Sequence, residues 1–370
     1  MDGSDQPRVG LVLGAGGVLG GAWLTGALAA IARETGWDPG SSRYIVGTSA
    51  GSMVGALLAC GVPPWFMAAH SSGQRLAAPA DARDHVGARV ESPDGSSSRL
   101  LRGAPMIGPG SWRLALSSLA RPYRYSPATV VAGWLPRGLI STQPLQETIR
   151  RVCGEHWAPH PNFWAMAVDY QTGRRIALGR AGAPDAELGA AVAASCAIPG
   201  FFRPVEIAGR RYVDGGVRSV SNLDVLFDER LDLVIALNPM SSLHRGSSAS
   251  LGERVAFAIR QASGRRLASE ASRVRAAGTE VILIQPTVHD LDAMGTNLMN
   301  RSKRRAVIET AAQSVGDHLR ASQAGERLAA LPAGIPALVR KPPGPVRALP
   351  PFSELARARF AGAPAPTTAG

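Results

Sequence analysis

Short apolar runs alternate along the chain with longer segments in which apolar residues recur every three or four positions. The short runs span residues 8–13, 44–46, 163–170, 231–237 and 280–285, and their continuous apolar character predicts strands buried on both faces. The longer segments predict helices at residues 22–34, from about residue 50 onward, and at 142–153, 186–196, 251–277 and 303–328. This alternation indicates an α/β fold built on a parallel sheet.

The first apolar run has a competing interpretation. Residues 9–32 are long enough and apolar enough to cross a bilayer as a helix. Five glycines between positions 14 and 21 disfavour a continuous helix, and neither a basic segment nor a small-residue cleavage site precedes the run. We therefore predict a strand at 8–13, a glycine loop at 14–21 and a helix at 22–34 that ends near Gly36.

Two segments differ in composition from the rest of the chain. Residues 63–137 are rich in Pro, Gly, Ser and Arg, with aromatic residues interspersed, and we expect a flexible, lid-like insertion there. The alternative is a solvated, partly disordered insertion without that role. Residues 331–370 are dominated by Pro and Ala, so we expect a disordered tail outside the core. The main domain is then expected to cover residues 1–330.

Composition and charge limit the function classes. The chain has 370 residues, 45% of them hydrophobic, and a formal net charge of +12. This charge favours contact with phosphates, anionic membranes or nucleic acid without choosing among them. Three cysteines without close pairing argue against a disulfide framework or a zinc site, so we expect a cytoplasmic protein without a metal or other cofactor.

The apolar run at 44–46 leads directly into Gly47-Thr48-Ser49-Ala50-Gly51. A strand, a G-x-S-x-G turn and a helix form the nucleophile elbow of serine hydrolases, in which the flanking glycines avoid clashes across a strained turn. Ser49 lies at the amino end of the predicted helix, where the helix dipole favours negative charge on its oxygen. The alternative is a chance match in a chain with 42 glycines.

The glycine loop after the first strand has two known uses. It binds a dinucleotide pyrophosphate in one class of protein and presents backbone N–H groups to an oxyanion in another. A dinucleotide site expects an acidic residue at the end of the second strand, where this chain has the Gly47–Ser49 turn instead. We favour an oxyanion hole formed by Gly16, Gly17 and Val18. A dinucleotide-binding oxidoreductase remains the alternative.

Four motifs together resemble the patatin-like phospholipases. They are Gly14-Ala15-Gly16-Gly17-Val18-Leu19-Gly20, the Ser49 turn, Ala197-Ile198-Pro199-Gly200, and Val213-Asp214-Gly215-Gly216. Their order and spacing match from about residue 8 to about residue 238. The resemblance implies a three-layer α/β/α sandwich with a mostly parallel central sheet, and hydrolysis of lipid acyl esters by a dyad of Ser49 and Asp214.

The resemblance also implies roles for the glycines. Gly14, Gly20, Gly47 and Gly51 support the two turns, and Gly215 and Gly216 let the backbone approach the serine closely. The chain departs from the family pattern where Ala15 replaces a glycine and Leu19 replaces the usual arginine. A catalytically weak or inactive lipid-binding or scaffold protein on the same fold is therefore the alternative function.

Asp214 follows a predicted hairpin of residues 202–207 and 211–213, at a glycine-rich bend. We expect it to act as the general base, although a lone D-G-G is also typical of an ordinary turn. A Ser-His-Asp triad would instead need His244, His289 or His318. The expected partners are a lipid or acyl-ester substrate and, by peripheral contact, an anionic membrane surface, whereas no nucleic acid is expected. The sequence does not indicate the oligomeric state.

Overall fold

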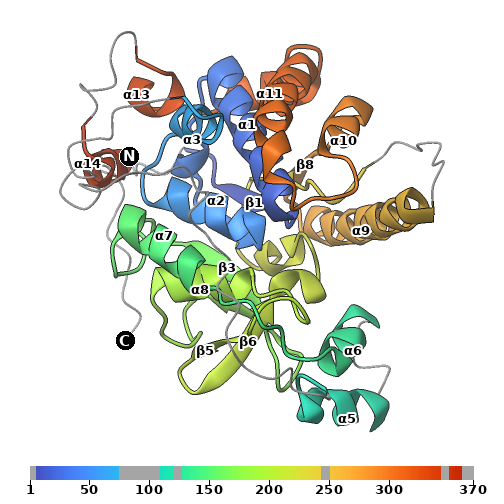
Figure 1. Cartoon of the computed structure of the whole chain (residues 1–370). Helices are drawn as coiled ribbons and strands as arrows, with labels where there is room; N and C mark the ends of the chain where they lie inside the picture. The colour runs from blue at the N-terminus through green and yellow to red at the C-terminus, as the bar shows by residue number, and fades with distance from the viewer. Residues whose placement is uncertain (1–5, 75–108, 121–126, 243–250, 343–349, 361–370) are drawn as a thin grey trace.

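A computed structural model describes residues 6–74, 109–120, 127–242, 251–342 and 350–360 of the chain (Figure 1). Its strands form a single mixed sheet in the order β5-β6-β3-β2-β1-β7-β8, and β4 also pairs with β3. The strands are β1 (Val9–Leu13), β2 (Tyr44–Thr48), β3 (Phe163–Asp169), β4 (Arg175–Leu178), β5 (Val205–Ile207), β6 (Arg210–Asp214), β7 (Leu233–Leu237) and β8 (Glu280–Ile284).

The middle of the sheet is parallel. β1 pairs in parallel with both β2 and β7, β2 pairs in parallel with β3, and β7 with β8. β4, β5 and β6 make the antiparallel pairs. Leu13 pairs with Gly47, so the carboxyl ends of β1 and β2 lie side by side. The predicted α/β class with a mostly parallel sheet is confirmed.

Helices cover both faces of the sheet. They are α1 (Gly17–Thr35), α2 (Ala50–Ala59), α3 (Pro64–Ser71), α5 (Trp112–Ala120), α6 (Pro127–Trp134), α7 (Gln143–Cys153), α8 (Leu188–Ser195), α9 (Leu251–Ala276), α10 (Val288–Met294), α11 (Arg304–Arg320), α12 (Gln323–Ala329), α13 (Pro336–Val339) and α14 (Phe352–Arg359). Short 3-10 helices are η1 (Pro39–Ser41), η4 (Gly215–Val217), η5 (Leu223–Leu226) and η6 (Arg301–Lys303).

Successive strand residues point to opposite faces of the sheet, and each face has its own core. Leu11 and Leu13 of β1 pack in the larger core with α1, α2, α8 and α11. Val12, between them, packs in a second core with Leu267 and Ala271 of α9. Helix, sheet and helix therefore form three layers, as the family resemblance implies.

The glycine-rich N-terminal run forms a strand and a helix, not one continuous helix. β1 covers Val9–Leu13 as predicted, but α1 begins at Gly17, five residues before the predicted start. The backbone of Gly17, at φ 62°, lets the helix start inside the glycine segment. Among the described residues, no helix combines the length and apolar character needed to span a bilayer.

The prediction for residues 331–370 is wrong over the part that the structure describes. α13 and α14 lie against the core, and Leu338, Phe352 and Leu355 are buried there. Arg359 of α14 forms a buried ion pair of 2.7 Å with Asp38 beside η1. A few apolar residues spaced among the prolines and alanines attach these two helices to the core. They are too few to change the overall composition of the segment, on which the prediction rested. Residues 343–349 and 361–370 lie outside the described residues.

The predicted lid-like segment 63–137 divides into parts with different surroundings. α3 belongs to the core, where the Trp65 indole N–H donates to the carbonyl of Ala337 at 2.9 Å. α5 and α6 project at the lower right of Figure 1, away from α1 and α11. Residues 75–108 and 121–126 lie outside the described residues. A lid-like role for the segment stays a prediction.

The predicted helix at 303–328 is two helices, α11 and α12. Ser322 separates them because its backbone is extended, at φ −133° and ψ 151°. α10 was not predicted. It begins with a capping box, in which the side chain of Thr287 accepts the backbone N–H of Asp290 and the side chain of Asp290 accepts the backbone N–H of Thr287.

Candidate active site

Ser49 occupies the sharp turn between β2 and α2. Its backbone has φ 53° and ψ −120°, a strained conformation for a residue with a side chain. The glycines two positions before and after Ser49 are needed because the backbone on the other side of the turn leaves no room for a side chain. A Cβ on Gly47 would lie 2.6 Å from the backbone nitrogen of Ser52, and one on Gly51 would overlap the carbonyl oxygen of Leu13. The turn has the geometry expected of a nucleophile elbow.

A hydrogen-bond chain from two other elements fixes the backbone of Ser49. Its N–H donates to Oγ of Ser195 at 2.9 Å, and that hydroxyl donates to the carbonyl of Met166 at 2.7 Å. Ser195 is fully buried at the end of α8, and Met166 lies on β3. Sequence analysis missed Ser195, because no motif connects a serine 146 residues downstream with the elbow.

Asp214 lies at the end of β6, directly before η4. Its backbone N–H donates to the carbonyl of Ala197 at 3.0 Å, and its carboxylate accepts the N–H of Gly216 at 2.7 Å. The hydroxyl of Ser49 lies near enough to this carboxylate to lower its pKa. The structure thus brings together the two residues that the sequence analysis selected, from positions 165 residues apart in the chain.

Burial dominates the electrostatics of Asp214. The side chain is 5% exposed, and burial raises its pKa to about 6, although the hydrogen bonds from Gly216 and Ser49 oppose the shift. A carboxylate with this pKa is mostly ionised at neutral pH and is a stronger base than an exposed aspartate. It therefore has a suitable basicity for accepting a proton from a neighbouring hydroxyl.

Cys196 is a further buried group beside the pair. Its Sγ lies 3.8 Å from Oγ of Ser52. Burial, together with the negative charge of Asp214, raises the pKa of the Cys196 thiol to about 12. The thiol is therefore protonated at neutral pH and is a poor nucleophile there.

The glycine loop leaves several N–H groups available next to the serine. The N–H groups of Gly14 and Ala15 bond to the carbonyls of Leu237 and Val220, at 2.9 and 2.8 Å. Within the described residues, no acceptor is bonded to the N–H groups of Gly16, Gly17 or Val18. These three donors are the ones expected to form an oxyanion hole.

Close packing holds the loop in place. A Cβ on Gly16 would lie 2.8 Å from Cγ of Pro239, and one on Gly20 would lie 3.2 Å from the same atom. A Cβ on Gly14 would lie 2.7 Å from Oδ1 of Asn238. These contacts explain why glycines fill three of the positions, because a side chain would push the loop away from β7.

The two departures from the family pattern are accommodated by burial. Leu19 is fully buried in the larger core, and its N–H bonds to the carbonyl of Leu298 at 2.9 Å. Ala15 is also buried, and its Cβ lies 3.8 Å from the place that a Cβ on Gly216 would take. The burial of both side chains leaves the backbone N–H groups of Gly16, Gly17 and Val18 without an acceptor among the described residues. The loop after α10 completes this wall of the site, because a Cβ on Gly17 would lie 3.2 Å from Sδ of Met299.

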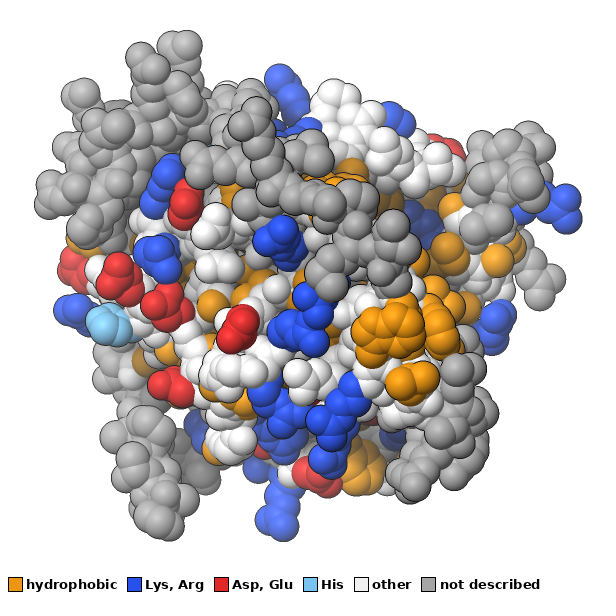
Figure 2. Space-filling view, turned by 60° about the horizontal axis from the view of Figure 1, so that its bottom comes forward, with side chains coloured by type: hydrophobic (Ala, Val, Ile, Leu, Met, Phe, Trp, Pro, Cys, Tyr) orange, Lys and Arg blue, Asp and Glu red, His pale blue; other side chains and the backbone are white. Residues whose placement is uncertain are grey.

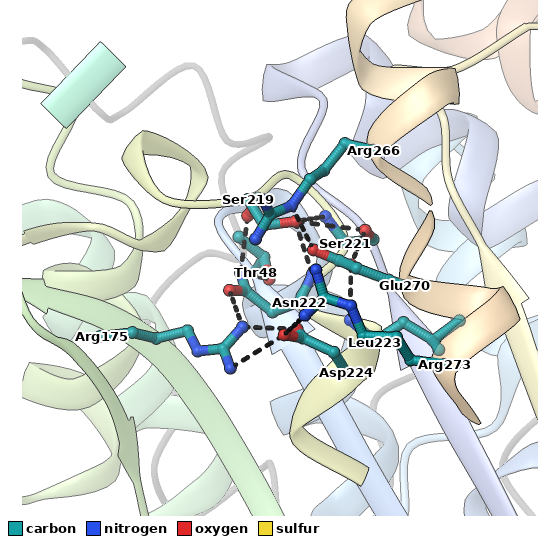
Figure 3. Close-up of polar contacts among 10 residues, drawn as sticks. All are labelled: Thr48, Arg175, Ser219, Ser221, Asn222, Leu223, Asp224, Arg266, Glu270 and Arg273. Atoms are coloured by element: carbon teal, nitrogen blue, oxygen red, sulfur yellow. Dashed lines mark hydrogen bonds and ion pairs between the residues drawn. The ribbon is translucent and has the colours of Figure 1, made fainter. Parts of the chain in front are cut away.

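A buried polar cluster on the other side of the elbow connects its strand to the segment after Asp214 (Figure 3). Thr48, the residue before Ser49, accepts a hydrogen bond of 3.0 Å from the amide of Asn222. The same amide donates to the carbonyl of Ser219 at 2.6 Å. Asn222 has a left-handed backbone, at φ 53°. It therefore links the segment that carries Ser49 to the segment after Asp214 through one side chain.

Charged groups surround this linking amide. The fully buried carboxylate of Glu270 accepts hydrogen bonds from the Ser221 hydroxyl at 2.6 Å and from the Leu223 N–H at 3.1 Å. Arg175 forms an ion pair of 2.6 Å with Asp224 and donates to Oδ1 of Asn222 at 3.3 Å. Sequence analysis did not identify these residues, because they carry no motif and come from separate elements.

The histidines considered for a triad lie elsewhere. His289 on α10 and His318 on α11 are exposed, and neither bonds to Ser49 or Asp214 in the structure. His244 lies outside the described residues. In the part of the chain that the structure describes, no three His, Cys, Asp or Glu side chains gather in a way that could hold a metal ion.

The arrangement can perform acyl transfer. A hydroxyl on a strained turn lies near a carboxylate of raised pKa, and N–H groups without an acceptor among the described residues follow the neighbouring strand. These are the nucleophile, the base and the oxyanion donors that ester hydrolysis requires.

Comparison with known proteins agrees with this geometry. A family model described as patatin-like phospholipase matches residues 11–227, a range that includes the glycine loop, Ser49 and Asp214. Uncharacterized NTE family proteins of Mycobacterium bovis and of two strains of Mycobacterium tuberculosis are each 26% identical to this chain over 239 residues. The matched span covers 64% of this chain and 50% of each relative, so the chain spans about half the length of these curated relatives.

Proposed function

Because this chain belongs to the patatin-like phospholipase family, we propose that it hydrolyses carboxylic ester bonds of phospholipids or related lipids. Membership of this family supports lipid hydrolysis as the general class of activity. The dyad and its residues are our proposal. The observation that carries it is that the hydroxyl of Ser49, on a strained turn, lies near the buried carboxylate of Asp214 and lowers its pKa.

In the first half of the proposed reaction, Oγ of Ser49 forms a bond to the ester carbonyl carbon while its proton passes to Asp214. The carbonyl oxygen becomes negatively charged and accepts hydrogen bonds from the N–H groups of Gly16, Gly17 and Val18. The bond between that carbon and the alcohol oxygen then breaks. The alcohol leaves with the proton from Asp214, and the acyl group remains on Ser49.

In the second half, water attacks the acyl group and gives a proton to Asp214. The intermediate collapses, the fatty acid leaves, and the proton returns to Oγ of Ser49. Asp214 thus acts as base and then as acid in each half, which a carboxyl with a pKa of about 6 can do near neutral pH.

Two observations favour turnover over the alternative of an inactive, lipid-binding scaffold. The three N–H groups expected at the oxyanion have no bonded acceptor among the described residues, so they are not used for structural purposes. Ala15 and Leu19, which replace a glycine and an arginine of the family pattern, are both buried and are accommodated by the fold. Backbone donors do not depend on the side chain at the replaced positions.

A fluorophosphonate probe and p-nitrophenyl acyl esters test the proposal. We expect wild type to be labelled and to hydrolyse the esters, and Ser49→Ala to lose both, with turnover reduced by at least about a thousandfold. Ser72→Ala, at the end of α3, is the matched control for a serine replacement away from the site. His289→Ala and His318→Ala should keep most of the activity.

Three outcomes would contradict parts of the proposal. Turnover retained by a folded Ser49→Ala would exclude Ser49 as nucleophile. A histidine replacement that reduces kcat as far as Ser49→Ala would indicate a triad. A folded wild type that binds lipid but is neither labelled nor active would favour the scaffold alternative.

A further inference from the structure

The helices α5 and α6 present large apolar side chains to solvent. Trp112 is 60% exposed, Leu116 57%, Val131 57% and Trp134 41%. Residues 112 and 116 are one helical turn apart, as are 131 and 134, so each helix presents a continuous apolar strip. Large apolar side chains that are exposed together on the outside of a protein are typical of an interaction site.

The opposite sides of both helices are anchored to the sheet. Leu114 of α5 is fully buried in a small core with Val168 and Val213 of β3 and β6. The hydroxyl of Tyr170 donates to the carbonyl of Ala132 in α6 at 2.8 Å. The exposed strips therefore belong to the outer surface of a packed unit, and their outward direction is fixed by these contacts.

The apolar surface continues to the edge of the candidate active site. Ile198 and Phe201, in the loop after α8, are 39% and 46% exposed. A Cβ on Gly200 between them would lie 3.4 Å from Cδ1 of Leu135, which follows α6. The same loop begins at Ala197, whose carbonyl accepts the backbone N–H of Asp214. An apolar molecule on this surface would thus lie against the loop that holds the backbone of Asp214.

Positive charge borders the apolar surface. Arg113 and Arg203 are exposed, and Arg137 and Arg211 are partly exposed. Burial lowers the pKa of Arg137, and the positive charges of Arg211 and Arg203 lower it further. No carboxylate of the described residues forms an ion pair with Arg203 or Arg211. Figure 2 shows hydrophobic side chains gathered on the side where α5 and α6 lie in Figure 1, next to a group of basic side chains.

We propose that this docking face, composed of Trp112, Leu116, Val131, Trp134, Ile198 and Phe201 with Arg113, Arg137, Arg203 and Arg211 beside them, binds the surface of an anionic lipid bilayer. The aromatic and aliphatic side chains enter the boundary between headgroups and acyl chains, and the guanidinium groups pair with lipid phosphates. The assignment of this face to the substrate's membrane rests on the proposed function, whereas the binding itself does not.

Charge complementarity favours a bilayer over a second copy of this chain. A symmetric dimer through this face would bring the same arginines of two chains together, whereas an anionic bilayer neutralises them. The aromatic rings also suit the polar and apolar boundary of a membrane.

Cosedimentation with vesicles tests the docking face. All proteins carry Ser49→Ala, so that hydrolysis does not consume the lipid and binding is measured independently of the proposed activity. Vesicles of phosphatidylcholine are compared with vesicles that also contain phosphatidylglycerol, at low and high salt. The variants are Trp112→Ser with Leu116→Ser, and Arg203→Glu. The matched controls are Val288→Ser on α10 and Arg305→Glu on α11, two exposed residues on helices that lie away from α5 and α6 in Figure 1.

We expect binding to anionic vesicles that falls steeply with salt, because screening shortens the reach of the charges. Arg203→Glu should weaken binding about 25-fold, since each charge near an anionic surface contributes about fivefold. The Trp112 and Leu116 double variant should weaken it about tenfold, and the controls should bind like the parent. Circular dichroism checks that each variant is folded.

Equal binding to neutral vesicles at any salt, or unchanged binding by both variants, would overturn the proposal. Loss of a dimer in the double variant on gel filtration, without an effect on vesicle binding, would assign the face to a second copy instead. Because the parent is Ser49→Ala, vesicle binding can be confirmed when the esterase test fails, and the reverse also holds.

Discussion

Replacing Asp214 with asparagine should make the protein inactive and, at neutral to alkaline pH, more stable. The carboxylate has a pKa of about 6 in the folded protein and an ordinary value of 3.8, because burial penalises its charged form. A raised carboxyl pKa means that the folded state holds its proton more tightly than the unfolded state. The stability from this group is therefore present below pH 3.8 and lost as the pH rises through about 6.

The pKa difference gives the magnitude. The rise of the Asp214 pKa from 3.8 to about 6 means that its charge destabilises the folded state by about 3 kcal/mol at pH 8. At pH 4.5 this destabilisation is about 1 kcal/mol. Asparagine removes the charge and keeps an oxygen that can accept the N–H of Gly216. The free energy of unfolding of Asp214→Asn should thus exceed that of wild type by up to about 3 kcal/mol at pH 8. This difference should be smaller by about 2 kcal/mol at pH 4.5.

Urea unfolding of both proteins at pH 8 and pH 4.5 measures the difference, and ester hydrolysis measures the activity. Asp228→Asn is the matched control, since it replaces an exposed aspartate after η5. Wild-type activity should fall below pH 6 as Asp214 becomes protonated, and Asp214→Asn should be inactive at every pH.

Equal stability of Asp214→Asn and wild type at both pH values would refute the argument that burial of the charge costs stability. Substantial activity in the variant would show that the base is another group. The two results are independent, because one concerns the folding equilibrium and the other the chemical step.

Three further changes test other parts of the structure. Gly17→Val should reduce kcat/KM at least about a hundredfold and cost about 1–3 kcal/mol, since a branched residue is strained at φ 62°, and esterase kinetics with urea unfolding would show both. Ser195→Ala should lower kcat about tenfold with little change in KM, because the N–H of Ser49 loses its acceptor, and an unchanged kcat would contradict its positioning role. Arg359→Met should cost about 3–5 kcal/mol in urea unfolding by leaving Asp38 buried without its partner, and a loss below about 1 kcal/mol would show that the pair is not needed.

The sequence was sufficient for the parts of the site that depend on local backbone geometry. Gly47, Ser49 and Gly51 lie within one turn, and the strand before them and the helix after them are visible in the apolar pattern. The family resemblance then related this turn to Asp214. The parallel order of the central strands followed from the same alternation of strands and helices.

The groups that hold the site in place were beyond the sequence analysis. Ser195 and Asn222 reach the elbow, and Glu270 reaches the segment after Asp214, through side-chain hydrogen bonds between distant elements. Such contacts have no periodicity and no fixed spacing, so only the folded arrangement identifies them. Composition misled the prediction for residues 331–370 in the same way, because a few buried residues were enough to attach α13 and α14 to the core.

The ion pair between Arg359 and Asp38 also has a consequence for folding while the chain is being synthesised. The two residues are 321 positions apart, and at about 5–20 residues per second the ribosome needs about 15–60 seconds to add that length. During this interval the segment that leads from α1 to β2 and Ser49 exists without the arginine that covers Asp38. Newly made chains should therefore pass through a state in which Ser49 has been synthesised but its surroundings are incomplete. Chaperones and proteases that act on nascent chains would meet this state before the folded protein exists.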